Sequence, residues 1–170
     1  MNAKDLLVPT QRQMLGTLKG LLAKAAADPR GDALLSARLA EDMHPLSVQV
    51  RFLCNMVGEA MARIAGIEFT SSEDDPATIA AAQARVDETL MQLAEWENFK
   101  FVADDAAIEL AIPNGMTFDM TAAEYVRDWS VPQFYFHTMA AYSILRKEGI
   151  EVGKADFVPY MMRYIRAPAS

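Results

Sequence analysis

Residues 121–149, TAAEYVRDWSVPQFYFHTMAAYSILRKEG, contain the signals that decide the fold. Thr121 and Glu124 form a capping-box pattern, in which two residues satisfy each other's backbone N–H groups at the start of a helix. Gly149 is a typical residue just beyond the last turn of a helix. The segment therefore predicts a long helix over residues 122–147.

One residue in this segment conflicts with a regular helix. Pro132 has no backbone N–H to donate, and its ring crowds the preceding turn. A straight helix through this position would lose about 3 kcal/mol. We therefore predict a kink or a break near residues 128–130.

Three earlier segments show apolar residues at the three-and-four spacing of amphipathic helices. The first is expected from about Pro9 to Ala26. The second begins with Pro45, which suits a first helical turn, and stops at Gly66. The third is expected to begin with Asp75 as its N-cap residue. The stretch before it, TSSEDDP at residues 70–76, is interpreted as an ordinary interhelical loop.

Residues 107–120, AIELAIPNGMTFDM, change to the alternating period of β-strands around a Pro-Asn-Gly turn. They predict a small hairpin. The expected fold class is therefore all-α: a four-helix bundle with a small β-hairpin before the last helix. Residues 1–170 are expected to form a single domain.

Composition narrows the classes of function. The net charge is −7, and nucleic-acid binding normally requires a basic surface, so we expect no nucleic-acid partner. The apolar stretches are too short to span a bilayer, and the N-terminus lacks a secretion signal, so we expect a cytoplasmic protein with no membrane partner. The single cysteine, Cys54, lies beside an apolar stripe and is interpreted as a core residue.

The C-terminal tail, residues 150–170, contains the apolar stretch FVPYMMRYI. A tail of this composition is expected to pack on the bundle or on a second subunit. Aromatic residues, methionine and arginine are enriched at subunit interfaces, which favours a homodimer.

Two longer stretches carry a family resemblance: ARLAEDMHPLSVQVRFLCNM, and VPQFYFHTMAAYSILRKEGIEVGKADF. Together they resemble an uncharacterised bacterial family of domains of unknown function in the DinB/YfiT-like superfamily. The resemblance extends over about residues 9–158. It implies a four-helix bundle, and dimers are frequent in the superfamily.

The resemblance also implies where a metal would be bound. Many DinB-like proteins hold a divalent ion with three histidines, and the matching positions here are Gln49, Gln133 and His137. Two of the three are glutamine, a neutral and weak ligand, whereas zinc and nickel favour imidazole. The only other histidine, His44, lies five residues before Gln49 on a different helical face. We therefore expect no metal cofactor; if a metal is bound, its ligand is His137.

The same residues predict a polar pocket in place of the metal site. We expect His137 to face the bundle interior, within hydrogen-bonding or water-bridged reach of a polar residue of the second helix, Gln49. Candidate pocket residues are His137, Gln133, Gln49, Tyr142 and Asp128. A tyrosine such as Tyr142 more often packs at the bundle surface or at a subunit boundary, and a carboxylate such as Asp128, one turn after Glu124, is more often a capping or solvated charge.

Two functions remain after these exclusions. The first is a non-catalytic or small-ligand-binding bundle protein with a degenerate metal site. The alternative is a metal-dependent enzyme of the DinB-like kind, a thiol-dependent transferase or hydrolase, using a divalent metal such as zinc or nickel. The number of histidines favours the first function, and whether the protein is an enzyme stays open.

Overall fold

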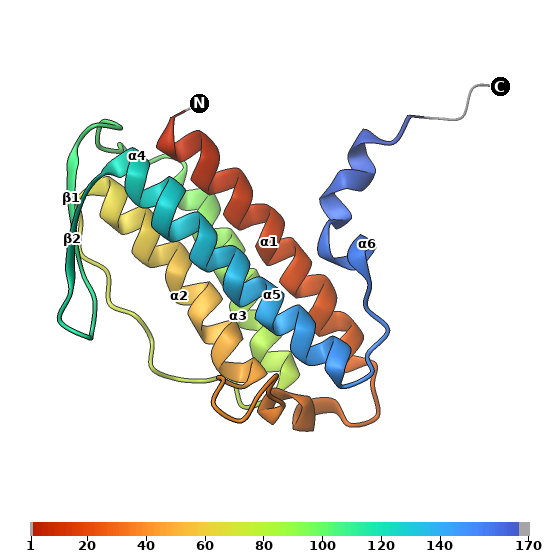
Figure 1. Ribbon diagram of the computed structural model, residues 1–170. Coiled ribbons are helices and arrows are strands. Elements are labelled where there is room, and N and C mark those ends of the chain that lie inside the picture. Colours follow the sequence, from red (N-terminus) through yellow and green to blue (C-terminus); the bar gives the residue numbers. More distant parts are fainter. Residues whose placement is uncertain (1, 167–170) are drawn as a thin grey trace.

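The computed structural model describes residues 2–166, and four long helices form the body of the protein (Figure 1). They are α1 (Ala3–Ala26), α2 (Leu46–Ala65), α3 (Ile79–Trp96) and α5 (Val131–Lys147). Both α1 and α2 pack on α3 and on α5, so α1 and α2 lie diagonally across the bundle. The predicted four-helix bundle is confirmed.

The predicted hairpin is also present. Strand β1 (Ala107–Ala111) pairs antiparallel with β2 (Thr117–Thr121), with Leu110 opposite Phe118. Gly115 in the connecting turn has a φ of 89°, a conformation that glycine adopts without steric cost. The remaining short elements are η1 (Gly31–Ser36), α4 (Ala122–Glu124), η2 (Tyr125–Ser130), α6 (Lys154–Phe157) and η3 (Pro159–Tyr164).

A single apolar core fills the bundle. It contains fully buried side chains from each long helix, for example Leu18, Leu53, Leu93 and Ile144. Cys54 belongs to this core, as its sequence position indicated, and burial raises the pKa of its thiol to about 11. A thiol in this environment is neutral at physiological pH and has a packing role.

The first helix begins earlier than predicted, at Ala3 instead of Pro9. Asn2 caps it by accepting a hydrogen bond from the Asp5 backbone N–H, and the Asp5 side chain completes a capping box. Pro9 lies inside the helix. A proline this close to the N-terminus removes one backbone hydrogen bond, which the cap and the buried apolar face of α1 offset.

The third helix begins later than predicted, at Ile79. Its N-cap residue is Thr78, whose side chain accepts a hydrogen bond from the Ala81 N–H. Asp75, the predicted cap, instead accepts a hydrogen bond at 2.7 Å from the Arg51 side chain on α2. Asp75 therefore attaches the extended segment before α3 to α2, and Thr78 caps the helix instead.

The last helix starts with the predicted capping box between Thr121 and Glu124. The expected disturbance near residues 128–130 takes the form of a π-helical segment, η2, in which the Val131 N–H donates to the Val126 carbonyl. The wider turn places Pro132 at the start of α5, where its missing N–H costs less. There is no break, because the chain stays helical from α4 to α5 (Figure 1).

The first part of the C-terminal tail packs on its own bundle. The Thr17 hydroxyl donates to the Phe157 carbonyl at 2.9 Å, Lys24 forms an ion pair with Asp156 at 2.8 Å, and the Tyr142 ring contacts the Phe157 ring. Element η3 then lies at the side of α1 with no buried residue (Figure 1). Residues 167–170 of the tail lie outside the described residues. Within residues 2–166, no helix combines the length and apolarity that crossing a membrane requires.

Candidate functional site

A cleft of about 490 Å³ lies along the seam between α2 and the last helix. Two rows of side chains at helical spacing form its long walls. Trp129, Gln133 and His137, each four residues apart, come from η2 and α5, and the opposite row comes from α2. The lining residues are Arg51, Phe52, Asn55, Met56, Glu59, Ser71, Glu73, Pro113, Trp129, Gln133 and His137.

His137 forms the hydrogen bond to Gln49 that the sequence predicted. The distance between His137 Nδ1 and Gln49 Oε1 is 2.8 Å, and the Gln49 amide nitrogen donates to the His44 carbonyl at 3.2 Å. Because Gln49 presents its oxygen to the imidazole, Nδ1 must carry the proton and Nε2 must carry a lone pair. Gln49 is almost fully buried, so this orientation of the ring is set from within the bundle.

Aromatic rings surround the imidazole. The Phe52 ring meets the His137 ring edge-on at 5.2 Å and the His44 ring at 5.1 Å. Burial, with a smaller effect from His44, lowers the pKa of His137 to about 4. The ring is therefore neutral at physiological pH, and Nε2 is a hydrogen-bond acceptor.

The half-buried Gln133 is the second neutral polar group of this wall. Neither its amide nor His137 Nε2 forms a hydrogen bond with another residue between 2 and 166. Both lie at the cleft, so both are available to a bound molecule.

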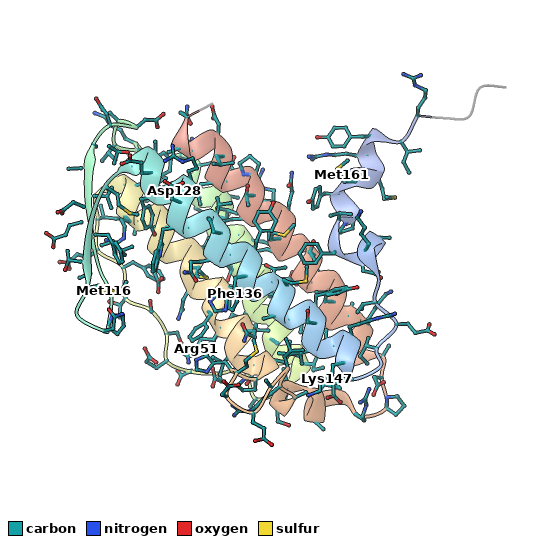
Figure 2. All side chains as sticks on the ribbon, viewed as in Figure 1. Arg51, Met116, Asp128, Phe136, Lys147 and Met161 are labelled. Carbon is teal, nitrogen blue, oxygen red and sulfur yellow. The ribbon has the colours of Figure 1, made fainter. Side chains whose placement is uncertain are left out.

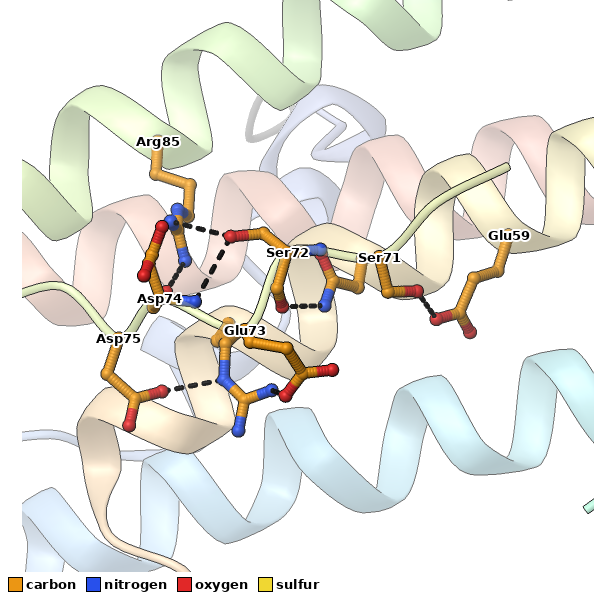
Figure 3. Close-up of polar contacts among 9 residues, drawn as sticks. Glu59, Ser71, Ser72, Glu73, Asp74, Asp75 and Arg85 are labelled. Carbon is orange, nitrogen blue, oxygen red and sulfur yellow. Dashed lines mark hydrogen bonds and ion pairs between the residues drawn. The ribbon is translucent and has the colours of Figure 1, made fainter. Parts of the chain in front are cut away.

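The opposite side of the cleft is closed by residues 67–78, which we call the strap. This extended segment runs along α2 and is tied to it at successive turns (Figure 3). Asn55 donates to the Ser72 carbonyl at 2.8 Å and accepts from the Ser72 N–H at 3.1 Å. Glu59, one turn later, accepts a hydrogen bond from Ser71.

Arg51 and Arg85 hold the other end of the strap. The Arg51 guanidinium bonds to Asp75 at 2.7 Å and to Glu73 at 3.2 Å, and it also lies over the Phe52 ring. From α3, Arg85 donates to the Asp74 carbonyl (Figure 3). The strap is thus held by side chains of two helices.

Sequence reasoning missed the strap as part of the site, because TSSEDDP was interpreted as an ordinary loop. The polar residues Arg51, Asn55 and Glu59 were the available signal. They recur every four residues on one face of α2, which indicates a polar partner along that face. Trp129 was also missed, although it continues the spacing of Gln133 and His137 by one more turn.

Two predicted pocket residues lie elsewhere. Tyr142 is five residues beyond His137, hence on a different face of α5, and it packs against Phe157 of the tail. Asp128 is exposed near the start of the last helix (Figure 2) and pairs with Arg127, which lowers the pKa of the Asp128 carboxyl. The structure therefore brings His137, Gln133 and Gln49 together, and it leaves Tyr142 and Asp128 outside the cleft.

The residues at the matching metal position do not fit a zinc or nickel ion. The Gln49 oxygen, one of the three implied donors, is turned toward His137 Nδ1. One imidazole and one remaining amide are too few and too weak for such ions. Among the described residues, no group of three or more His, Cys, Asp or Glu side chains is arranged to hold a metal.

Comparison with known proteins identifies a family and a similar solved structure. The sequence profile of a family described as "Domain of unknown function (DUF1993)" matches residues 4–158. A crystal structure of a DinB family member protein from Shewanella denitrificans is similar to this chain, with a TM-score of 0.76 and 31% sequence identity. That similarity covers 98% of this chain and 93% of the other. No significant match was found among curated proteins.

Proposed function

This chain belongs to the DUF1993 family, a DinB-like family of unknown function, and we propose that it binds a small molecule beside His137 without transforming it. The observation that carries the proposal is the neutral imidazole at the cleft, with Nδ1 tied to Gln49 and Nε2 unpaired within residues 2–166. An acceptor held in one orientation provides directional recognition of a ligand N–H or O–H group.

The protonation states and positions of the candidate reactive side chains support binding over catalysis. Asp128 is paired with Arg127, Cys54 is buried with a raised pKa, and His137 is a weak base in its present environment. Asp128 and Cys54 lie outside the cleft, and His137, which reaches it, has too low a pKa to be an efficient general base near neutral pH.

A thermal-denaturation screen of a metabolite library against the wild-type protein, His137→Leu and Gln133→Leu tests the proposal. A ligand present at a hundred times its Kd stabilises the native state by about 2.7 kcal/mol, which raises the melting temperature. We expect ligands that stabilise the wild type and lose that effect in both variants. Gln133→Leu keeps the test informative if His137→Leu fails to fold, because Gln133 forms no hydrogen bond with another described residue.

Three results would overturn this function. Ligands that stabilise both variants as strongly as they stabilise the wild type would place the binding site elsewhere. Chemical turnover of a bound ligand would make the protein an enzyme. Stoichiometric zinc or nickel in protein purified without a histidine tag, lost in His137→Ala, would support the metal-dependent alternative.

We also propose that the protein's partner is a second copy of itself. The outer face of α5 carries an apolar groove of about 380 Å³, and the tail beside it exposes further apolar side chains (Figure 2). Phe136, Met139 and Met161 are each about half exposed. Phe157 forms one wall of this groove and begins the exposed tail, so the two surfaces are continuous.

Charge supports a second copy as the occupant. The chain has a net charge of −7, while residues 157–166 carry two arginines and no acid, so the remainder carries −9. A basic, methionine- and tyrosine-rich arm is therefore complementary to the acidic body of another copy.

Light scattering on the full chain, on a chain ending at Tyr160, and on Met139→Asp tests the dimer. Ending at Tyr160 retains Phe157 and Tyr160, which pack on the molecule's own core. We expect a mass of twice 18.8 kDa for the full chain and the monomer mass for both altered forms. Met91→Asp on α3, at a methionine that is 64% exposed against 46% for Met139, is the control and stays dimeric. A monomeric full chain, or a dimer that survives both changes, would contradict this interface.

A further inference from the structure

The cleft beside His137 carries more negative than positive charge. Its charged lining residues are Arg51, Glu59 and Glu73. Arg51 is already paired with Glu73 and with Asp75 at the edge of the strap. Counting Asp75, three carboxylates face one guanidinium, so a bound anion would be repelled and a cation attracted.

The only cation of the lining set is also held away from a ligand. Only 14% of the Arg51 side chain is exposed, and its guanidinium lies 4.9 Å from the centre of the Phe52 ring. Stacking on Phe52 uses its face, bonding to two carboxylates uses Nε and Nη1, and these carboxylates already balance its charge. Arg51 therefore organises the strap and is not available as an anion receptor.

The neutral polar groups of the cleft are acceptors for the hydrogen-bond donors of a ligand. The tautomer of His137 leaves Nε2 as an acceptor, and the Gln133 amide offers a carbonyl oxygen. Glu59 is exposed, and Ser71 is its only hydrogen-bond partner between residues 2 and 166. Acceptors thus stand on both long walls of the cleft.

Trp129 adds an aromatic surface to the same wall. The indole is half-buried, four residues before Gln133, and lines the cleft. Its large ring can contact the apolar body of a ligand whose polar group lies about two helical turns away at His137. Phe52 and Met56 on α2 offer apolar contacts opposite it.

We infer that the cleft binds an organic cation: an ammonium or amidinium group whose N–H donors reach His137 Nε2 and the carboxylates, attached to an apolar body lying against Trp129. This inference rests on the proposed function and narrows it to one class of ligand. Free anions such as carboxylates and phosphates are the class that the cleft disfavours.

Three probes of matched shape and different charge test the inference: benzylamine, benzyl alcohol and benzoate. The chain has two tryptophans, so Trp96→Phe leaves Trp129 as the sole tryptophan reporter of the cleft. We expect benzylamine to change the fluorescence at the lowest concentration and benzoate at the highest. The preference should decrease in 0.5 M salt, because salt screens charges at exposed sites.

Carboxylate variants locate the source of the preference. Glu59→Gln and Glu73→Gln should each weaken benzylamine binding about two- to five-fold, the range of a single exposed ion pair, and leave benzyl alcohol unchanged. Glu151→Gln removes the same charge at a different cavity, beside Lys24 and Gly149, and is the matched control. It should leave all three affinities unchanged.

The outcomes distinguish failure of this inference from failure of the proposed small-molecule binding on which it rests. If benzoate binds Trp129 as tightly as benzylamine, the ligand class is wrong while small-molecule binding at the cleft stands. The class is also wrong if none of the three probes changes Trp129 fluorescence but library ligands still stabilise the protein through His137. If neither the probes nor the library bind, the proposed function itself fails.

Discussion

Besides α2, the cleft is bounded by a helix wall, Trp129, Gln133 and His137 of the last helix, and by a strap wall, residues 67–78, and these two walls are held by different forces. Trp129, Gln133 and His137 project from a continuous helical segment whose inner residues, such as Phe134, are buried in the core. Within the described residues, the strap makes no backbone–backbone hydrogen bond between residues 68 and 77. Core packing therefore positions the helix wall, and a few side chains position the strap wall.

The strap is expected to adjust to a ligand more readily than the helix wall. A segment held by a few side-chain contacts opens at lower free energy than a helix packed into the core. The acceptors His137 and Gln133 lie on the rigid wall, whereas Glu73 and Ser71 lie on the strap. A ligand would meet a preformed surface on one side and a surface that can adjust on the other.

The sharpest test compares two phenylalanines: Phe134, buried behind the helix wall, and Phe69, on the strap. Phe134 is 1% exposed, and Phe134→Ala should lower the free energy of unfolding by about 3–5 kcal/mol, the usual loss for a buried phenylalanine. Phe69, 41% exposed, lies over Gly58 of α2, and Phe69→Ala should cost about 1 kcal/mol. Chemical denaturation measures both. Equal losses would mean that the strap is as integral to the fold as the helix.

The helix wall was the more predictable of the two from sequence. The apolar spacing placed Gln49 and His137 on facing helices, and the predicted hydrogen bond is present. The strap was missed because residues 67–76 form neither helix nor strand and so have no sequence period of their own, although their partners Arg51, Asn55 and Glu59 recur every four residues on α2. Pro9 gave a wrong helix start because the Asn2–Asp5 capping box lies upstream of it.

The next largest effect is the pH dependence of the helix wall. The pKa of His137 is lowered to about 4 in the folded state from an ordinary value of 6.5. Between these values the unfolded chain binds more protons than the folded one, so stability falls as pH decreases from about 6.5 to 4 and then levels off. The shift corresponds to at most about 3 kcal/mol, and the partial exposure of the ring reduces it.

Urea denaturation of the wild type and His137→Leu across pH 4–7 measures this effect. The wild type should lose more stability than His137→Leu over the interval, because the variant lacks this titrating group. Parallel pH profiles for the two proteins would contradict the assignment of a neutral, desolvated imidazole. If the wild type alone became more stable as pH falls, the pKa of His137 would have to be raised on folding and not lowered.

A smaller effect is expected from the strap. Asn55→Ala removes both hydrogen bonds to Ser72, which should cost about 1 kcal/mol because water can replace them at this half-buried site. Hydrogen exchange followed by mass spectrometry should show faster exchange in peptides covering residues 67–78 and unchanged exchange in α5. Asn55→Asp keeps the acceptor for the Ser72 N–H and should give an intermediate rate. Accelerated exchange in α5 would show that the two walls unfold as one unit.

The smallest change in overall stability should come from Gly58→Ala, because it acts on α2 and on the strap in opposite directions. A Cβ at Gly58 would overlap the Phe69 ring, so the ring has to move and the strap loses an apolar contact. Alanine favours the helix by about 1 kcal/mol relative to glycine, which stabilises α2 by a similar amount. We expect the free energy of unfolding to change by less than about 0.5 kcal/mol. Limited proteolysis within residues 67–78 should nevertheless become faster, since the strap is released while the helix is strengthened. A variant destabilised by several kcal/mol, with no faster cleavage, would show that Phe69 belongs to the core and that the contrast between the two walls is wrong.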